Sequence, residues 1–166
     1  MKIKLKFLIA CVLILFLITA GINRLVENSS ERKYSENIRQ ITTICEYLNS
    51  EQFKTYDIIR IDIFDSLTRI HCSKKDDLNG GYANTDYTIT DSNLIDCLKI
   101  LGNHKFSRIL KEYNYTYFQI KSSFNESTGL IYSPDEEPDL SEINAAKKTL
   151  KKLKYDGWYY NKTVYN

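Results

Sequence analysis

The chain is 166 residues long, and its formal net charge of +2 makes it nearly neutral. Without a strongly basic composition, a surface that attracts nucleic acid is not expected, and we predict no nucleic-acid partner. Six glycines and two prolines are too few for a long linker or a low-complexity region, and the length suits one folded domain.

The N-terminal segment is a run of apolar residues preceded by three lysines. Residues 7–22 carry no charge, and Lys2, Lys4 and Lys6 come before them. As a helix, this run reaches roughly 24 Å, slightly short of a ~30 Å hydrocarbon core. Because positive residues stay on the cytoplasmic side, we predict a single-pass signal anchor over residues 1–24 with its N-terminus in the cytoplasm. The alternative is a cleaved signal peptide and a secreted protein, and the sequence does not decide between them.

Residues 25–166 are predicted to form a single extracytoplasmic domain. Once the three N-terminal lysines are set aside, acidic residues outnumber basic ones by one. The membrane is the first predicted partner of this chain, through the apolar residues 7–22. A composition rich in Ile, Asn, Lys and Tyr is typical of proteins encoded by AT-rich bacterial genomes.

The first element of this domain is predicted to be a helix that ends near Ser50. Asn28 and Glu31 fit a capping box. The apolar residues that follow recur at spacings of three and four, which places them on one side of the helix. The stripe is too short for a coiled coil, so we expect it to pack on the domain itself. Its members are Tyr34, Ile38, Ile41, Cys45 and Leu48.

Strands are predicted next. Ile59, Ile61 and Ile63 alternate with charged residues, as in a half-buried strand. "LTRIHC" is expected to be a second strand, and "YTIT" at residues 87–90 its returning partner, because the turn signal Asn-Gly-Gly separates them. A short helix is then capped by Asp91 or Ser92 and ended by Gly102. Its apolar face contains Leu94, Cys97, Leu98 and Leu101.

The C-terminal third is predicted to contain a hairpin, a strand, a helix and a final strand. "KFSRIL" and "YTYFQIKSSF" form the hairpin around residues 112–114, and "GLIYS" and "GWYYN" are the two strands. The helix between them is capped by Asp139 and Glu142 and carries Leu140, Ile143, Ala146, Leu150 and Leu153 on one side. These elements predict an α+β domain, with helices packed on an antiparallel sheet. Its predicted core includes Ile59, Ile61, Ile63, Ile120, Leu150 and Trp158.

Few residues suit catalysis, and we predict no catalytic residue, no metal and no cofactor. Of the two histidines, His71 and its neighbour Cys72 point to opposite faces of a strand, and His104 follows a helix end. The acidic "PDEEPD" is interpreted as a charged helix start rather than a calcium loop. A secreted hydrolase that uses Asp62 or Asp65 is kept as an alternative.

Three cysteines lie outside the N-terminal segment, each on a predicted apolar face. Cys45, Cys72 and Cys97 are interpreted as buried apolar residues. An oxidising compartment also permits one disulfide among them, and the sequence does not decide whether any two are bridged.

The remaining candidates are contact residues for a partner. Rings and lysines are concentrated in the C-terminal region: Trp158, Tyr159, Tyr160, Lys148, Lys151 and Lys152. A closing strand whose Trp158 seals the core is the structural alternative. We predict a non-catalytic, membrane-anchored module that binds a protein or a cell-envelope component; an envelope immunity or inhibitor protein is the second hypothesis. The identity of the partner and the oligomeric state are not predicted.

Overall fold

The structure, a computed structural model, describes residues 32–63, 69–76, 80–112, 114–140 and 147–165. The predicted anchor over residues 7–22 and the carboxylate of Asp65 lie outside these ranges. None of the helices in the described part is long and apolar enough to cross a membrane.

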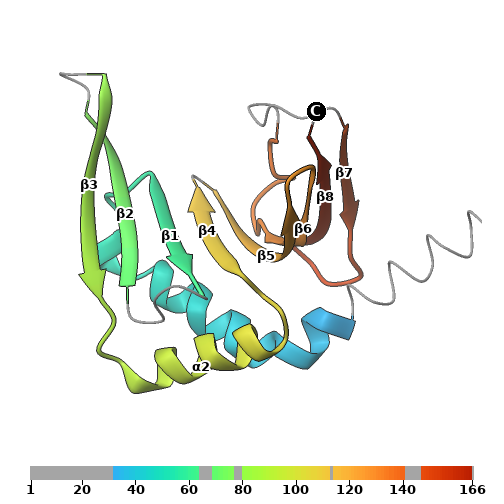
Figure 1. Cartoon of the computed structure of the whole chain (residues 1–166), viewed down its shortest axis with the longest axis horizontal. Helices are drawn as coiled ribbons and strands as arrows, with labels where there is room; N and C mark the ends of the chain where they lie inside the picture. The colour runs from blue at the N-terminus through green and yellow to red at the C-terminus, as the bar shows by residue number, and fades with distance from the viewer. Residues whose placement is uncertain (1–31, 64–68, 77–79, 113, 141–146, 166) are drawn as a thin grey trace, which may run out of the picture.

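Eight antiparallel strands make up the sheet of the described residues, in the order β3-β2-β1-β4-β5-β6-β8-β7 (Figure 1). Five of the seven strand pairings join strands that are consecutive in the sequence; the other two pair β1 with β4 and β6 with β8, so that β8 lies between β6 and β7. The strands are β1 (Ile58–Asp62), β2 (Arg69–Asp76), β3 (Gly81–Thr88), β4 (Arg108–Glu112), β5 (Tyr115–Ser123), β6 (Glu126–Tyr132), β7 (Lys147–Lys152) and β8 (Trp158–Val164).

Two helices lie along one side of the sheet, below the strands in Figure 1. The first covers residues 32–48, and a 3-10 turn, η1 (Glu51–Phe53), follows it. The second, α2 (Ser92–Asn103), begins after Asp91, whose side chain accepts hydrogen bonds from the backbone N–H groups of Asn93 and Leu94. A sheet with helices on one face confirms the predicted α+β class in its coarse form.

The core lies between these helices and the sheet. The predicted residues Ile59, Ile61, Ile63 and Trp158 are buried there, whereas Ile120 is only partly buried. Leu150, also predicted in this core, is partly buried and packs against a separate cluster instead. The four predicted apolar positions of α2 are buried as well. In the helix over residues 32–48, four of the five predicted stripe positions are buried, and Ile38 is 45% exposed.

The predicted helix after Asp139 is wrong where the structure describes it. Residues 147–152 form β7, which pairs along its whole length with β8 and forms one edge of the sheet. Hydrogen bonding to β8 overrides the helical spacing that Leu150 and Leu153 shared in the sequence. Lysines are common on edge strands because they discourage pairing with a further chain. Ile143 and Ala146 lie outside the described residues.

Other boundaries differ less. The returning strand of the first hairpin is β3, which reaches back to Gly81 and ends at Thr88 instead of Thr90. The helix α2 continues one residue beyond Gly102. The C-terminal hairpin is confirmed, with Glu112 and Tyr115 as the pair next to its turn.

The sheet bends where β5 meets β6. The register between these strands shifts between Gln119 and Lys121, opposite the segment that contains Gly129. A bulge of this kind bends a strand and increases its twist. Gly129 also leaves room for its neighbour: a Cβ there would lie 2.4 Å from a ring carbon of Tyr117. The Tyr117 ring therefore lies across the backbone of β6, on the side of the sheet away from the helices.

Candidate functional site

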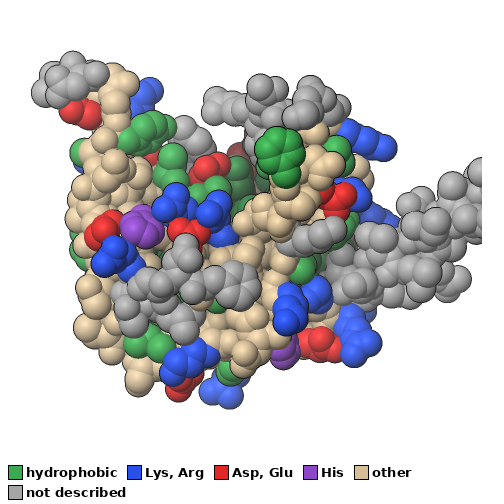
Figure 2. Space-filling view, viewed as in Figure 1, with side chains coloured by type: hydrophobic (Ala, Val, Ile, Leu, Met, Phe, Trp, Pro, Cys, Tyr) green, Lys and Arg blue, Asp and Glu red, His purple; other side chains and the backbone are tan. Residues whose placement is uncertain are grey.

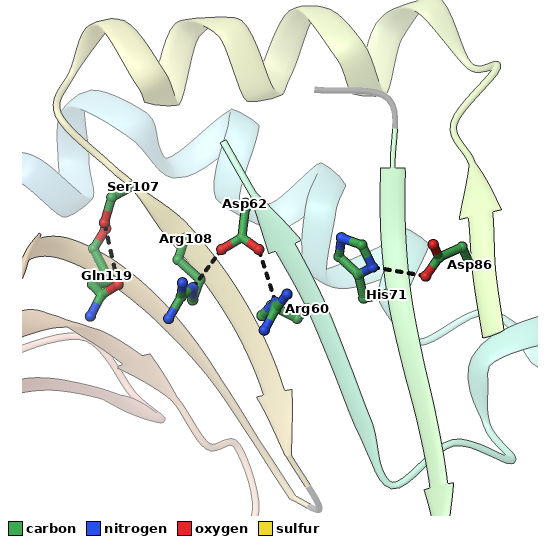
Figure 3. A network of polar contacts seen from close by, with 7 residues as sticks. All are labelled: Arg60, Asp62, His71, Asp86, Ser107, Arg108 and Gln119. Atoms are coloured by element: carbon green, nitrogen blue, oxygen red, sulfur yellow. Dashed lines mark hydrogen bonds and ion pairs between the residues drawn. The ribbon is translucent and has the colours of Figure 1, made fainter. Parts of the chain in front are cut away.

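The face of the sheet opposite the helices carries polar side chains, and we call it the polar face. Alternation along the strands determines it: Ile61 of β1 points to the core, so Arg60 and Asp62 point to the polar face. His71 of β2 and Arg108 of β4 lie in the same layer (Figure 3). In Figure 2 charged side chains and a histidine gather over β2, β1 and β4.

On the part of the polar face formed by β2, β1 and β4, the carboxylate of Asp62 lies between the guanidinium groups of Arg60 and Arg108. The Nε of Arg108 is 2.6 Å from one Asp62 oxygen, and the Nε of Arg60 is 2.8 Å from the other. Arg108 and Asp62 are cross-strand neighbours, so the sheet register itself brings them together. Both oxygens of Asp62 are therefore engaged by a charged donor. Asp62, one of the two carboxylates kept for a hydrolase, is thus paired with one guanidinium of its own strand and one of β4.

A second pair of polar side chains lies at the edge of the same face. His71 and Asp86 are register partners on β2 and β3, and the Nδ1 of His71 is 2.8 Å from an oxygen of Asp86. The second histidine, His104, follows the last residue of α2, as its predicted place after a helix end required. The two histidines thus lie on different sides of the sheet, so they do not share a site.

The other half of the polar face is hollowed. A cavity of about 210 Å³ lies over β4, β5, β6 and β8, next to the segment that ends at Leu140. Its walls combine hydroxyl, amide and apolar groups with one guanidinium and one carboxylate. The lining residues are Arg108, Leu110, Glu112, Tyr115, Tyr117, Gln119, Ser127, Ile131, Leu140, Asn161, Thr163 and Tyr165.

Uncharged polar side chains form the floor of this hollow. Ser127 is 3% exposed, and its Oγ accepts a hydrogen bond from the amide of Gln119 at 2.9 Å. The hydroxyl of Tyr117 lies 2.8 Å from the same oxygen. On β8, the amide of Asn161 donates to the hydroxyl of Thr163 at 3.2 Å. These bonds offset the free-energy cost of removing polar groups from water.

Burial also changes the acidity of the Tyr117 hydroxyl. Removal of the phenol from water raises the pKa of Tyr117 to about 12, while hydrogen bonds with Ser127 and Asn161 act in the opposite direction. The hydroxyl is therefore protonated throughout the physiological range. It can donate and accept hydrogen bonds, but it is a poor general base.

The rim of the hollow is apolar. Tyr115, Ile131, Leu140 and Tyr159 form a second buried cluster, separate from the main core. The segment that ends at Leu140 is held at this cluster partly by Lys148, whose Nζ donates to the carbonyl of Leu140 at 2.7 Å. This cluster fixes one wall of the hollow by packing, so that the wall does not depend on the polar network.

The predicted contact residues lie in two places. Trp158 is 5% exposed and stacks on Tyr132 at a centroid distance of 4.8 Å, so it seals the core. Tyr159 is buried in the second cluster and Tyr160 is half-buried. The three lysines, Lys148, Lys151 and Lys152, lie on the edge strand β7 rather than on a helix. Their role in binding a partner stays a prediction.

The three cysteines in the described part of the chain are free thiols in the core. Burial raises the pKa of Cys45 to about 12 and that of Cys72 to about 11, and it also raises the pKa of Cys97. Thiolates are the reactive form, so these thiols react slowly at neutral pH. Across the described ranges, no three His, Cys, Asp or Glu side chains lie close enough together to hold a metal ion.

Sequence reasoning did not find the hollow. Gln119 lies between two apolar residues, whereas Ser127, Asn161 and Thr163 each have at least one polar or charged neighbour in the sequence, and polar positions of this kind are normally assigned to solvent. The available signal was the uncharged nature of these residues, since a solvated strand face usually carries Lys or Glu. Sequence alone does not reveal that the bend at β5 and β6 encloses them.

No protein-family model, no curated protein and no solved structure matches this chain.

Proposed function

We propose that this chain is a membrane-anchored extracytoplasmic module that binds a protein or cell-envelope component at its polar face and does not catalyse a reaction. The observation that carries the proposal is the hollow, where buried amides and hydroxyls gather beside apolar side chains. Specific ligand sites combine these two features: an apolar wall and a few fixed polar groups. The surrounding charges are held by partners in the protein.

The anchor part of the proposal depends on the N-terminal sequence. Residues 7–22 are uncharged and follow Lys2, Lys4 and Lys6, which favours a cytoplasmic N-terminus and a domain outside. Nine residues, 23–31, separate this run from the helix over residues 32–48. The domain would thus lie near the outer surface of the membrane, where envelope polymers are present.

The ion pairs favour binding over hydrolysis. A glycoside or ester hydrolase that depends on carboxylates needs one as a proton donor or as a nucleophile. Asp62 has both oxygens in ion pairs with guanidinium groups, and Glu112 accepts a hydrogen bond from Tyr115 at 2.7 Å. These carboxylates support and orient their neighbours, which is the role expected in a binding face.

The proposal is tested by fractionation of cells that express the full chain with a C-terminal epitope tag. We expect the tagged chain in the membrane fraction, and we expect protease added to intact cells to remove the tag. A soluble full-length form in the cytoplasm would refute the anchor. Turnover of an envelope polymer by the purified chain, abolished by Asp62→Asn, would refute the non-catalytic role.

A further inference from the structure

The size of the hollow limits what it can hold. Its volume of about 210 Å³ corresponds to about seven water molecules at roughly 30 Å³ each. Sites for drug-sized ligands are larger, about 300–1,000 Å³. The hollow can therefore hold a single ring with its substituents. It is too small for a helix or for a long peptide laid along β5.

The floor of the hollow selects for groups that both donate and accept hydrogen bonds. Amides and hydroxyls offer both functions, and Gln119, Ser127, Asn161 and Thr163 supply them from positions that are at most 9% exposed. A hydroxyl group of a ligand has the same dual character, so several hydroxyls can each find a matching partner. A phosphate or carboxylate group only accepts hydrogen bonds. If it bound here, its negative charge would face the hydrogen-bond acceptors of the floor.

The charges at the hollow do not favour an ion. Arg108 already pairs with Asp62 through its Nε, and Glu112 accepts from the hydroxyl of Tyr115. The two charged lining residues are of opposite sign, and each is held by a neighbour. An ionic ligand would have to compete with these contacts, whereas a neutral one leaves them intact.

The walls offer flat and apolar surfaces to a ring. Tyr115 and Tyr117 line the hollow together with Ile131 and Leu140, and Tyr165 lies at the mouth, 36% exposed. Tyrosine combines an apolar ring with a polar hydroxyl, which suits a ligand that has apolar C–H groups on its faces and hydroxyls around its edge. A sugar ring has this distribution.

We propose that the hollow binds one uncharged sugar unit, either of an envelope polysaccharide or of a glycolipid headgroup. This inference depends on the proposed binding function and names the ligand class of the same site. The sugar ring lies between the tyrosines and the apolar wall, and its hydroxyls exchange hydrogen bonds with the amides and hydroxyls of the floor.

The inference is tested with the full chain, purified in a detergent that has no sugar headgroup. The probes are the methyl glycosides of glucose, galactose and N-acetylglucosamine, with inorganic phosphate and a neutral, N-acetylated trialanine amide as the other ligand classes. Saturation-transfer NMR measures binding of the glycosides and of the peptide, and displacement of a bound glycoside measures binding of phosphate, which has no C–H protons. We expect at least one glycoside to bind saturably, and phosphate and trialanine amide to bind at least ten-fold more weakly.

Three variants locate the binding. Tyr165→Ala removes the ring at the mouth, and Tyr82→Ala removes a ring of similar exposure, 48%, on β3 outside the hollow. We expect Tyr165→Ala to weaken glycoside binding at least ten-fold and Tyr82→Ala to change it less than two-fold. Tyr117→Phe, which keeps the ring but removes a floor hydroxyl, is expected to weaken it three-fold or more. Thermal unfolding of each variant shows that its fold is retained.

The sugar source is distinguished by vesicles that contain a neutral glycolipid, compared with soluble oligosaccharides. Binding to either supports the inference, and the tighter of the two identifies the source. The inference is overturned if no glycoside, oligosaccharide or glycolipid binds, or if binding is insensitive to Tyr165→Ala and Tyr117→Phe. If trialanine amide binds in their place, the ligand is a peptide; the binding module then stands, and only its ligand class is wrong.

Discussion

The two faces of the sheet are built from the same strands but are held together in different ways. On the helix-covered face, rings and aliphatic side chains fill the space: Trp158 lies 4.5 Å from the ring centroid of Tyr34 and 4.8 Å from that of Tyr132. On the polar face, Gln119 and Ser127 are almost as buried, but they are held by hydrogen bonds. Burial of apolar area stabilises the first face, whereas hydrogen bonds on the second mostly offset lost hydration.

This difference indicates that the two faces have different roles. A face that is buried but polar adds less to the free energy of folding than an apolar face of the same area would. We infer that the first face provides stability and the second provides specificity. Substitutions on the helix-covered face should therefore mainly lower stability, and substitutions on the polar face should mainly weaken binding.

The largest effect is expected from Trp158→Ala. Removal of a buried indole costs about 3–5 kcal/mol in free energy of unfolding. The unfolding of the variant in urea should be followed by circular dichroism, since Trp158 is the only tryptophan and its fluorescence disappears. Tyr165→Ala, at the mouth of the hollow, is the control and should stay within about 0.5 kcal/mol of the original chain. Equal losses in the two variants would contradict the division between the faces.

Gly129→Ala should have the next largest effect. A Cβ at this position meets the carbonyl oxygen of Phe118 and the ring of Tyr117, each at 2.4 Å. The backbone of β5 cannot move away freely, so we expect a loss of about 1–3 kcal/mol. Ligand binding should weaken as well, because the displaced Tyr117 ring lines the hollow. Gly81→Ala, where no atom lies within 4 Å, is the matched control, and an equal loss there would show that close packing is not the cause.

A smaller effect is expected at the start of α2. Asp91→Ala removes the side chain that accepts from the N–H groups of Asn93 and Leu94, at a cost of about 1 kcal/mol. Asp96→Ala, in the same helix and exposed, should cost less than about 0.5 kcal/mol. Chemical unfolding measures both. Binding at the polar face should be unchanged in both variants, and a ten-fold loss of affinity in Asp91→Ala would show that the two faces are coupled.

The smallest effect on stability at neutral pH concerns the acidity of the Tyr117 hydroxyl. Its folded-state pKa of about 12 exceeds the ordinary value of about 10 for tyrosine. The stability that this shift contributes is fully present below pH ~10 and is lost as the pH rises toward 12. The loss between pH 10 and 12 should be smaller in Tyr117→Phe than in the original chain, although Cys45 and Cys72, with raised pKa values of about 12 and 11, contribute in both. Identical pH profiles would contradict the assignment.

Alternation and helical spacing in the sequence predicted most of the helix-covered face. The strand with Ile59 and Ile61 and the cap at Asp91 are confirmed, because each depends on local chemistry that survives in the fold. The lysine-rich segment was predicted as a helix, since Lys and Leu favour helices and the spacing fitted. Its true state, the edge strand β7, depends on β8, and single-sequence patterns do not report such a partner.

The candidate site was less predictable than the fold. Of its lining, the sequence singled out none of the floor residues, and its own candidate Trp158 is in the core. The hollow depends on the bulge between β5 and β6 and on the absence of a side chain at Gly129. Both act through the pairing of β5 with β6, whose register shift the sequence pattern does not reveal. A polar residue in a strand predicts which face it lies on, but not whether that face is enclosed.

The central claim is that the polar face, and not the helix-covered side, meets the partner. It is tested most directly by a photo-crosslinking amino acid placed at Tyr165 or, as a matched control, at Ile100. The two positions are 36% and 38% exposed, and Ile100 lies on the outer side of α2. On irradiation of intact cells, we predict a crosslinked envelope component from position 165 and none from position 100. Crosslinks from position 100 with none from position 165 would contradict the account.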